Sequence, residues 1–276
     1  MPEEEHWTHT LYVNHPELFL NLMEKHKEIA SREAVQLFQI LEGQLQLLPA
    51  STKILDLCCG IGIHSTELAK YGYEVVGLDL SPHCLRRAEQ LALENGLDEK
   101  RLRLYQGDAR QVARVLSERV ETGFNAILSI GNSFGFYGEK EDLEELRGLY
   151  DLASPNCIFI LDIINRDWLA RHCSPRGFSQ ITRRIQMDSE RKLNLETSYV
   201  ENEWKFYETT TTRKNNNRRL LLSLKMKLRT YSFDEVRGLL TKSRWEYLKS
   251  YGSISSLQRL TVETYHMVLL SKKKTS

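Results

Sequence analysis

Short apolar runs alternate with amphipathic segments along the middle of the chain. Apolar runs occupy residues 53–57, 73–80, 102–106 and 124–130, and each leads into a glycine or a polar residue. Runs of this length between turn residues are typical of buried strands, whereas the apolar spacing that starts at residue 63 is typical of a helix. The order of strand, turn, helix and strand predicts an α/β fold with a parallel sheet.

The flanks predict a helical cap before this sheet and two strands after it. Residues 1–48 offer an apolar face at helical spacing, which favours a helix that covers the sheet. Residues 232–240 predict a helix with a capping box made by Ser232 and Glu235. Residues 245–251 and 261–270 then predict two closing strands.

A long insertion interrupts the α/β pattern. About 55 residues stand between the fifth strand and the helix near Ser232, where a compact domain uses a handful. Alternation at residues 178–184, 194–201, 204–214 and 220–229, with a turn at Asn215, Asn216 and Asn217, predicts an antiparallel sheet. We call residues 171–229 the lid and expect it to lie over the carboxyl ends of the central strands. Edge protection or dimerisation is its alternative role.

The predicted organisation therefore has three parts. Residues 1–48 form an N-terminal helical cap, residues 49–170 and 230–276 form the core, and residues 171–229 form the lid.

The turn after the first strand carries the strongest chemical signal. The sequence K-I-L-D-L-C-C-G-I-G, residues 53–62, turns a buried strand sharply into a helix and places two glycines one residue apart. Such a turn leaves backbone N–H groups beside a crevice that suits nucleotide-like ligands. A purely structural tight turn is the alternative.

Acidic residues follow the next strands at the same edge of the sheet. Asp79 ends the second strand about twenty residues beyond the glycines, where a carboxylate can accept both hydroxyls of a ribose. Each hydrogen bond to an ionised acceptor is worth roughly 1.5 to 3 kcal/mol. Alternatively, Asp79 only precedes the N-cap Ser81 and the helix-starting Pro82. Asp108 follows the third strand.

With Asp56, Gly60 and Gly62 after the first strand, Asp79 after the second and Asp108 after the third, the chain resembles the class I S-adenosylmethionine-dependent methyltransferases. The resemblance implies a Rossmann-like seven-stranded sheet, mostly parallel with an antiparallel last strand. It also implies S-adenosyl-L-methionine as the methyl donor and S-adenosyl-L-homocysteine as the product.

The resemblance further implies a set of donor-binding residues. Gly60 and Gly62 would let the backbone approach the methionine part, Asp79 would hold the ribose, and Asp108 with Ala109 would face the adenine amino group. The full expected set is Trp7, Tyr12, Asp56, Cys58, Cys59, Gly60, Ile61, Gly62, Asp79, Leu80, Gly107, Asp108, Ala109, Ile130, Gly131 and Phe134.

Three positions differ from related patterns. Cys58 stands where the family has its first glycine, and we expect it to keep strand geometry because positive φ is costly for cysteine. Ser65 stands where a nicotinamide-binding turn needs its third glycine, which disfavours a dinucleotide enzyme. Asn156 lies in the family's Pro-Gly-Gly turn and tolerates the left-handed conformation.

Two further stretches, S-F-G-F-Y at residues 133–137 and L-D-I-I-N-R-D-W-L at residues 161–169, resemble a subgroup that methylates small molecules and carries a lid. In that subgroup an N-terminal segment folds over the donor, which makes Trp7 and Tyr12 candidates for closing the pocket, although W-T-H-T-L-Y-V-N-H-P looks too polar for a core.

No catalytic residue is assigned, because a sulfonium methyl group needs placement more than acid or base help. Holding donor and acceptor in line can supply roughly 7 to 11 kcal/mol of the barrier. The candidates for orienting the acceptor are Asn132, Tyr137, Arg229 and Tyr231, with His64, Asp162 and Asn165 near the same strand ends. His64 is better explained as a helix-face residue than as a base.

Charge is uneven along the chain. The 276 residues carry a net charge of +1, but residues 171–249 hold 18 Lys and Arg against 9 Asp and Glu. This basic insertion suggests a small anionic substrate, with tRNA, other RNA or protein as the alternative substrate. A solvated sheet face explains the same charges without any ligand.

Composition bounds the remaining properties. The hydrophobic share of 41% supports a sizeable core, and no apolar stretch approaches the ~20 residues that cross a bilayer. The N-terminus M-P-E-E-E-H-W is acidic, unlike a signal peptide, and the five cysteines lack the spacing of a zinc site. We therefore expect a cytoplasmic protein with free thiols, no metal and no membrane partner, either monomeric or a homodimer.

Overall fold

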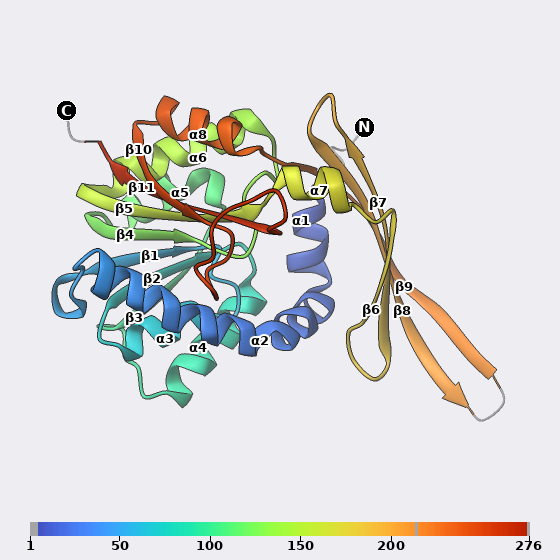
Figure 1. Cartoon of the computed structure of the whole chain (residues 1–276). Coiled ribbons are helices and arrows are strands. Elements are labelled where there is room, and N and C mark those ends of the chain that lie inside the picture. Colours follow the sequence, from blue (N-terminus) through green and yellow to red (C-terminus); the bar gives the residue numbers. More distant parts are fainter. Residues whose placement is uncertain (1–4, 213–214, 275–276) are drawn as a thin grey trace.

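The computed structural model describes residues 5–212 and 215–274. Seven strands form the central sheet in the order β10-β11-β5-β4-β1-β2-β3, as Figure 1 shows. The strands are β1 (Lys53–Leu57), β2 (Glu74–Asp79), β3 (Leu102–Gln106), β4 (Phe124–Ser129), β5 (Ala153–Ile164), β10 (Trp245–Tyr251) and β11 (His266–Lys273). Strand β11 is antiparallel to both of its neighbours, β5 and β10. This is the predicted fold class, with its antiparallel last strand.

Helices cover both faces of the central sheet because its strands alternate apolar side chains between the two faces. On one face, α2 (Pro16–Phe38), α3 (Ile63–Lys70) and α4 (Pro82–Glu94) pack against a buried cluster that includes Ile160 and Val268. On the other face, α5 (Val112–Glu118), α6 (Glu139–Leu152) and α8 (Phe233–Lys242) pack against a cluster that includes Phe159 and Leu161.

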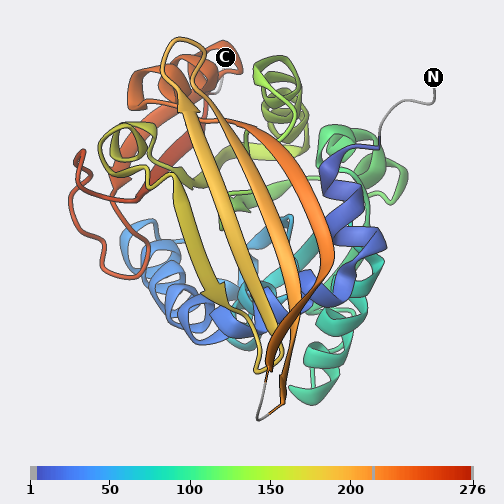
Figure 2. The ribbon, with the colours of Figure 1, turned by 90° about the vertical axis from the view of Figure 1, so that its right-hand side faces the viewer.

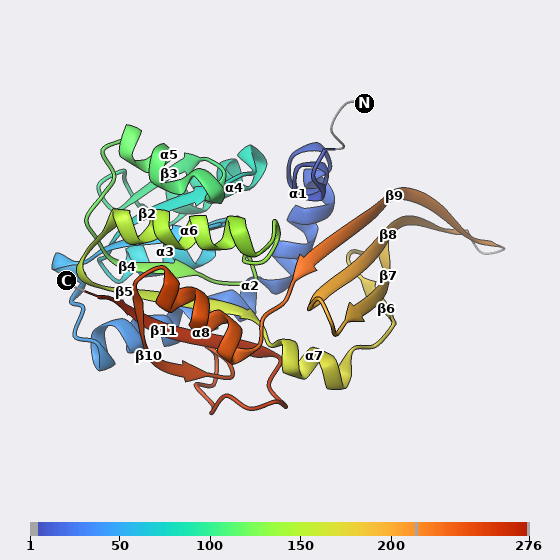
Figure 3. The same ribbon diagram turned by 90° about the horizontal axis from the view of Figure 1, so that it is seen from above.

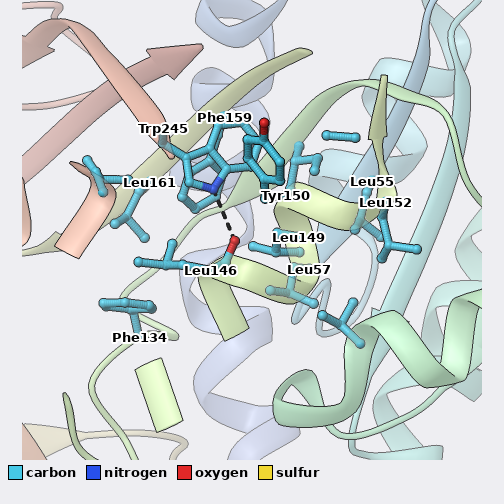
Figure 4. Packing of buried hydrophobic residues seen from close by; sticks show 14 of the residues in the cluster. Leu55, Leu57, Phe134, Leu146, Leu149, Tyr150, Leu152, Phe159, Leu161 and Trp245 are labelled. Atoms are coloured by element: carbon cyan, nitrogen blue, oxygen red, sulfur yellow. Dashed lines mark hydrogen bonds between the residues drawn. The ribbon is translucent and has the colours of Figure 1, made fainter. Parts of the chain in front are cut away.

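The second cluster is organised around Trp245 of β10. Figure 4 shows its indole beside Phe159 and Tyr150, with Nε1 donating a hydrogen bond to the carbonyl oxygen of Leu146 at 3.0 Å. The indole N–H is thereby satisfied inside an apolar core, as a buried tryptophan requires. Helix α8 begins at the predicted capping box, in which Ser232 and Glu235 satisfy each other's backbone amides.

The lid forms a separate antiparallel sheet in the order β6-β7-β8-β9. Its strands are β6 (Arg176–Gln180), β7 (Ile185–Asn194), β8 (Tyr199–Thr212) and β9 (Asn215–Arg229), and α7 (Arg166–His172) connects it to β5. Figures 1 and 3 place α1 (Trp7–His9) and the start of α2 between this sheet and the core, and in Figure 2 the lid strands cross the front of the molecule.

The lid rests on the N-terminal segment. Trp7, Leu11 and Leu18 are buried against Phe206 and Met226 from the inner face of the lid. The prediction that residues 7–16 are too polar for a core is therefore wrong, because their apolar side chains face the lid while their polar ones face outward or bond to neighbouring loops.

Several predicted boundaries in the lid are also wrong. The strand expected at residues 194–201 contains the connection between β7 and β8, and the strand expected at residues 178–184 ends at Gln180. Asn215 to Asn217 belong to β9, with Thr212 paired to Asn215, so the connection falls at residues 213–214, outside the described residues. Polar residues alternate through the turns as well as the strands here, so the alternation did not mark the ends.

The closing strand also begins later than expected. Strand β11 starts at His266 rather than at residue 261, since Thr261 and Thr264 form a turn that their side chains and backbone hold together. Among the described residues, none of the helices combines the length and the apolar character that a bilayer crossing requires.

Candidate functional site

The backbone of the turn after β1 is left-handed at three positions. Gly60 has φ +55° and Gly62 has φ +73°, as a glycine turn requires. Cys58 has φ +58°, so the expectation that it keeps strand geometry is wrong. The path of the chain out of the sheet sets the conformation at this position, and Cys58 adopts the glycine-like conformation at a cost of about 1 to 2 kcal/mol.

Gly62 allows the helix after the turn to approach α4. A Cβ at position 62 would lie 2.6 Å from Cβ of Ala88, closer than two carbon atoms can stand. Ile61, between the two glycines, is buried with Cys84 and Leu91 of α4. The turn is therefore pressed against α4 while its amide groups stay at the rim of the sheet.

Asp79 lies at the centre of this rim. Its Oδ2 accepts the amide of Gly60 and its Oδ1 accepts the amide of Ser81, both at 2.8 Å. Burial raises the pKa of Asp79 to about 6, while the hydrogen bonds from Ser81 and Gly60 act in the opposite direction. Each oxygen retains a second lone pair, so the carboxylate can accept two more hydrogen bonds from a ligand.

The structural interpretation of Asp79, as a residue that precedes a helix cap, agrees with these contacts. Ser81 caps α4, with its Oγ accepting the amide of Cys84 at 3.2 Å, and Asp79 fixes the residue before that cap. The same carboxylate faces the glycine turn. Sequence reasoning did not include Ser81 among the site residues. The signal that could have identified it is its position two residues after Asp79 and directly before Pro82.

Tyr12 and Trp7 come from the N-terminal segment, as expected for a cover over this rim. The carbonyl oxygen of Tyr12 accepts a hydrogen bond from Ser81 Oγ at 2.6 Å. Burial, together with the nearby Cys58 and Asp79, raises the pKa of Tyr12 well above its usual range, so its hydroxyl lies among the residues of the turn. Trp7 meets the ring of Tyr12 edge-on at 5.7 Å.

The end of β3 joins the same rim through Gly107, whose amide donates to the carbonyl oxygen of Asp79 at 3.0 Å. Asp108 is bound by Arg110, with both Asp108 oxygens 3.0 Å from Arg110 Nε. Arg110 in turn covers the ring of Tyr137 at 3.9 Å. The Asp108 carboxylate therefore lies at the rim and is bound by the guanidinium of Arg110.

The loop after β4 supplies an unsatisfied acceptor. Asn132 has φ +64°, and its Oδ1 is buried without a hydrogen-bond partner in the described structure. It lines a cavity of about 30 Å³, together with Phe134, Phe136 and Ile163. Gly131, the residue before it, is also left-handed, and its amide donates to Asp162 Oδ2 at 3.3 Å.

The other candidates for orienting an acceptor are occupied by structural contacts. Tyr231 donates its hydroxyl to Asp142, and Arg229 pairs with Glu235 at 2.6 Å, although both residues line the cavity beside Asn132. Tyr137 shares a hydrogen bond of 2.9 Å with Thr8. Asn165 caps α7 by accepting the amide of Asp167.

A polar cluster at the rim includes residues that the sequence did not single out. His64 Nε2 lies 3.3 Å from Glu33 Oε2 of α2, and Asp162 Oδ1 lies 2.9 Å from His266 Nδ1 of β11. We call His64, Glu33, Asp162 and His266 the rim cluster. Glu33 is one of many polar residues in α2 and His266 is the first residue of β11, so only the tertiary structure identifies them.

The remaining predicted residues pack around these groups. Leu80 is partly exposed, Ile130 and Phe134 are buried, and Ala109 packs against the core, while Ser65 donates its hydroxyl to Asp56. All five cysteines are free. Burial, followed by the charge of Asp79, raises the pKa of both Cys58 and Cys59 well above the usual range, which disfavours their thiolates as nucleophiles.

Comparison with known proteins agrees with this geometry. Residues 54–156 match a family model described as a methyltransferase domain. A glycine/sarcosine N-methyltransferase from Halorhodospira halochloris is 35% identical over 124 residues, which cover 44% of this chain and 43% of that protein. The chain therefore spans less than half the length of this curated relative.

Solved structures are similar over most of the chain. A S-adenosylmethionine-dependent methyltransferase from Clostridium acetobutylicum has a TM-score of 0.71 at 15% identity, over 88% of this chain and 92% of that one. CalS10, an amino pentose methyltransferase from Micromonospora echinaspora solved with bound S-adenosylmethionine, has a TM-score of 0.63 at 16% identity, over 89% and 92%.

The fold is thus that of the class I S-adenosylmethionine-dependent methyltransferases, as the glycine turn and the three acids indicated. Within it, residues 54–156 are the part that matches the family model described as a methyltransferase domain.

Proposed function

We propose that this chain binds S-adenosyl-L-methionine at the rim of its central sheet and transfers the methyl group to a small molecule. The observation that carries the proposal is the joint geometry of Gly60, Gly62 and Asp79, in which the carboxylate and a left-handed turn meet at 2.8 Å. The unsatisfied Oδ1 of Asn132 beside this rim supports the fit of a polar ligand.

We assign the following roles to the residues as part of the same proposal. Asp79 would accept the ribose hydroxyls, Asp108 and Ala109 would face the adenine, and Tyr12 with Trp7 would cover the nucleoside. When bound, the donor supplies a methyl group already activated by a sulfonium. The protein's part is then to exclude water and to align an acceptor in line with that group.

We further propose that the acceptor lies under the lid and is anionic. Arg191 pairs in register with Asn202, and Asn202 with Met226, so the three share the inner face on which Met226 is buried. Arg191 Nε donates to Asn202 Oδ1 at 3.0 Å, and in the part of the chain that the structure describes no carboxylate forms an ion pair with this guanidinium. An anionic group of a substrate would complete its contacts.

Part of the basic charge of the lid is paired within the lid, which gives less support to RNA. Arg218 pairs with Asp188, Arg219 with Glu208 and Lys205 with Glu203, so these three cations already have acidic partners. Binding to bulk tRNA with a steep salt dependence would favour the RNA alternative.

Substitution of Asp79 tests donor binding. We expect Asp79→Ala to lower the affinity for S-adenosyl-L-homocysteine at least 100-fold in calorimetry, since two hydrogen bonds to a carboxylate are lost at roughly 1.5 to 3 kcal/mol each. Asp151→Asn, at an exposed position of α6, is the matched control and should leave the affinity unchanged. Equal affinities for the Asp79 variant and the wild type would contradict the assignment.

A labelled methyl donor would identify the methyl acceptor. We expect label to pass to a compound in the small-molecule fraction of a cell extract, and not to RNA or protein. Arg191→Gln should then raise KM for that compound without changing S-adenosyl-L-homocysteine binding. An unchanged KM would contradict the anionic contact.

A further inference from the structure

The rim cluster brings together two histidine–carboxylate pairs from four elements. His64 of α3 and Glu33 of α2 have side chains that are 16% and 14% exposed, and Asp162 of β5 is 2% exposed beside His266 of β11. Polar groups this well buried carry a desolvation cost, which a purely structural contact between α2 and α3 does not need. A ligand that bonds to the pair would offset this cost.

His64 stands two residues beyond Gly62, at the start of the helix that follows the turn. In the described residues, Nδ1 of His64 and Oε1 of Glu33 make no hydrogen bond, so one donor and one acceptor remain for a ligand. Arg110 holds Asp108, and Arg87 pairs with Glu24 through its Nε.

The donor carries a group that matches this pair. Its amino-acid end is a zwitterion with an α-carboxylate and an α-ammonium, and it must lie near the glycine turn if Asp79 holds the ribose. The rim is otherwise acidic, with Asp56, Asp79 and Asp162 all buried. A carboxylate placed there needs a positive partner, and His64 is close to the turn.

We propose that His64 and Glu33 bind the amino-acid end of the methyl donor, with the imidazolium facing the α-carboxylate and Glu33 facing the α-ammonium. This inference rests on the proposed function and assigns the methionine part of the site to residues that only the tertiary structure brings together.

The electrostatic surroundings favour the charged imidazole. Burial lowers the pKa of His64, but the hydrogen bond that it donates to Glu33 and the charges of Asp56 and Asp162 raise it above its ordinary value. These acids face His64 from α2, β1 and β5, and His266 of β11 lies beyond Asp162. The imidazolium therefore persists to higher pH than a free histidine.

Two ligands separate this role from general damage to the site. S-adenosyl-L-homocysteine carries the amino-acid end, whereas 5′-methylthioadenosine has the same nucleoside and sulfur without it. We expect His64→Gln to lower the affinity for S-adenosyl-L-homocysteine at least tenfold in calorimetry and to change that for 5′-methylthioadenosine less than twofold. Glu33→Gln should act in the same direction.

The control is His172→Gln, which removes an exposed histidine that lies 3.2 Å from Glu263. It should change neither affinity. For the wild type, the ratio of the two affinities should fall as rising pH removes the proton from His64, and for His64→Gln the ratio should stay constant. Use of the ratio cancels the titration of Asp79, which affects both ligands.

Equal losses for both ligands, or no loss for either, would overturn this inference while leaving the proposed function in place. Failure of the wild type to bind S-adenosyl-L-homocysteine would overturn both. Retained binding of 5′-methylthioadenosine shows that each variant is folded around the turn, and Glu33→Gln provides the test if His64→Gln does not fold.

Discussion

At the scale of single residues, the turn after β1 shows that the path of the chain can impose a backbone conformation that the residue type disfavours. Cys58 takes a left-handed conformation that cysteine disfavours, because the chain must leave the sheet there. Gly62 differs, since at that position both the backbone angle and the space exclude a side chain. The sequence has cysteine at position 58, where the backbone angle is left-handed, and glycine at position 62, where the space is also limited.

Substitution of Gly62 should therefore be severe. We expect Gly62→Ala to lower the free energy of unfolding by about 2 to 4 kcal/mol, because a left-handed alanine is strained and its Cβ overlaps Ala88. Denaturant unfolding measures this loss. Gly96→Ala is the matched control, with φ +68° and no atom within 4 Å, and should cost only about 1 kcal/mol. Similar losses in both variants would contradict the role of the contact with Ala88.

At the scale of elements, a buried pair joins the antiparallel strand to its neighbour. His266 of β11 bonds to Asp162 of β5 at 2.9 Å, close to the point where β11 begins. Burial lowers the pKa of His266, but the hydrogen bond and the charge of Asp162 raise it above the ordinary value. The charge of Glu33 in α2 also raises the pKa of His266.

This pair should make stability depend on pH. A histidine whose folded pKa is raised stabilises the protein fully below its unfolded pKa, and the contribution is lost as pH rises through the folded pKa. We expect His266→Gln to lower the unfolding free energy more at pH 6 than at pH 8.5, as measured by urea denaturation. A loss that is the same at both pH values would show that the imidazole acts only by packing.

The elements also show how much of the fold the sequence could predict. Strands β1, β3 and β10 match their predicted residues, because each is a buried run between clear turn residues. The lid strands do not, because one face of that sheet is exposed and polar residues continue through its turns. The glycine turn after β1 was predictable from local spacing. The rim cluster was not, since Glu33, Asp162 and His266 lie far apart in the chain and meet only through topology.

At the scale of the whole molecule, α2 connects the lid with the core. Lys25 Nζ donates to Ser179 Oγ and to the carbonyl oxygen of Gln180 in β6, each at 3.0 Å. On the core side, Glu24 pairs with Arg87 of α4 at 2.9 Å. Helix α2 therefore links β6 of the lid to α4, the helix that packs against the glycine turn.

A substitution that weakens the contact between the lid and the N-terminal segment tests whether the lid is coupled to the core. Phe206 is fully buried between the lid and the N-terminal segment. We expect Phe206→Ala to weaken this contact by about 3 to 5 kcal/mol. Hydrogen exchange should then accelerate in β6–β9 and in α1, while β1, β4 and β5 stay protected. The control, Leu220→Ala, removes a side chain that is 52% exposed and should change little. Uniform acceleration throughout the chain would show that the lid and the core unfold as one unit.

The docking of Trp7 and Leu11 against Phe206 and Met226 also matters for synthesis. The two sides of this apolar contact are separated by nearly two hundred residues of sequence. During translation the early segment leaves the ribosome long before its partner exists, and at 5 to 20 residues per second it waits for roughly 10 to 40 seconds. For that interval its tryptophan and leucines are open to chaperones, which makes the nascent chain a substrate for them until the lid emerges.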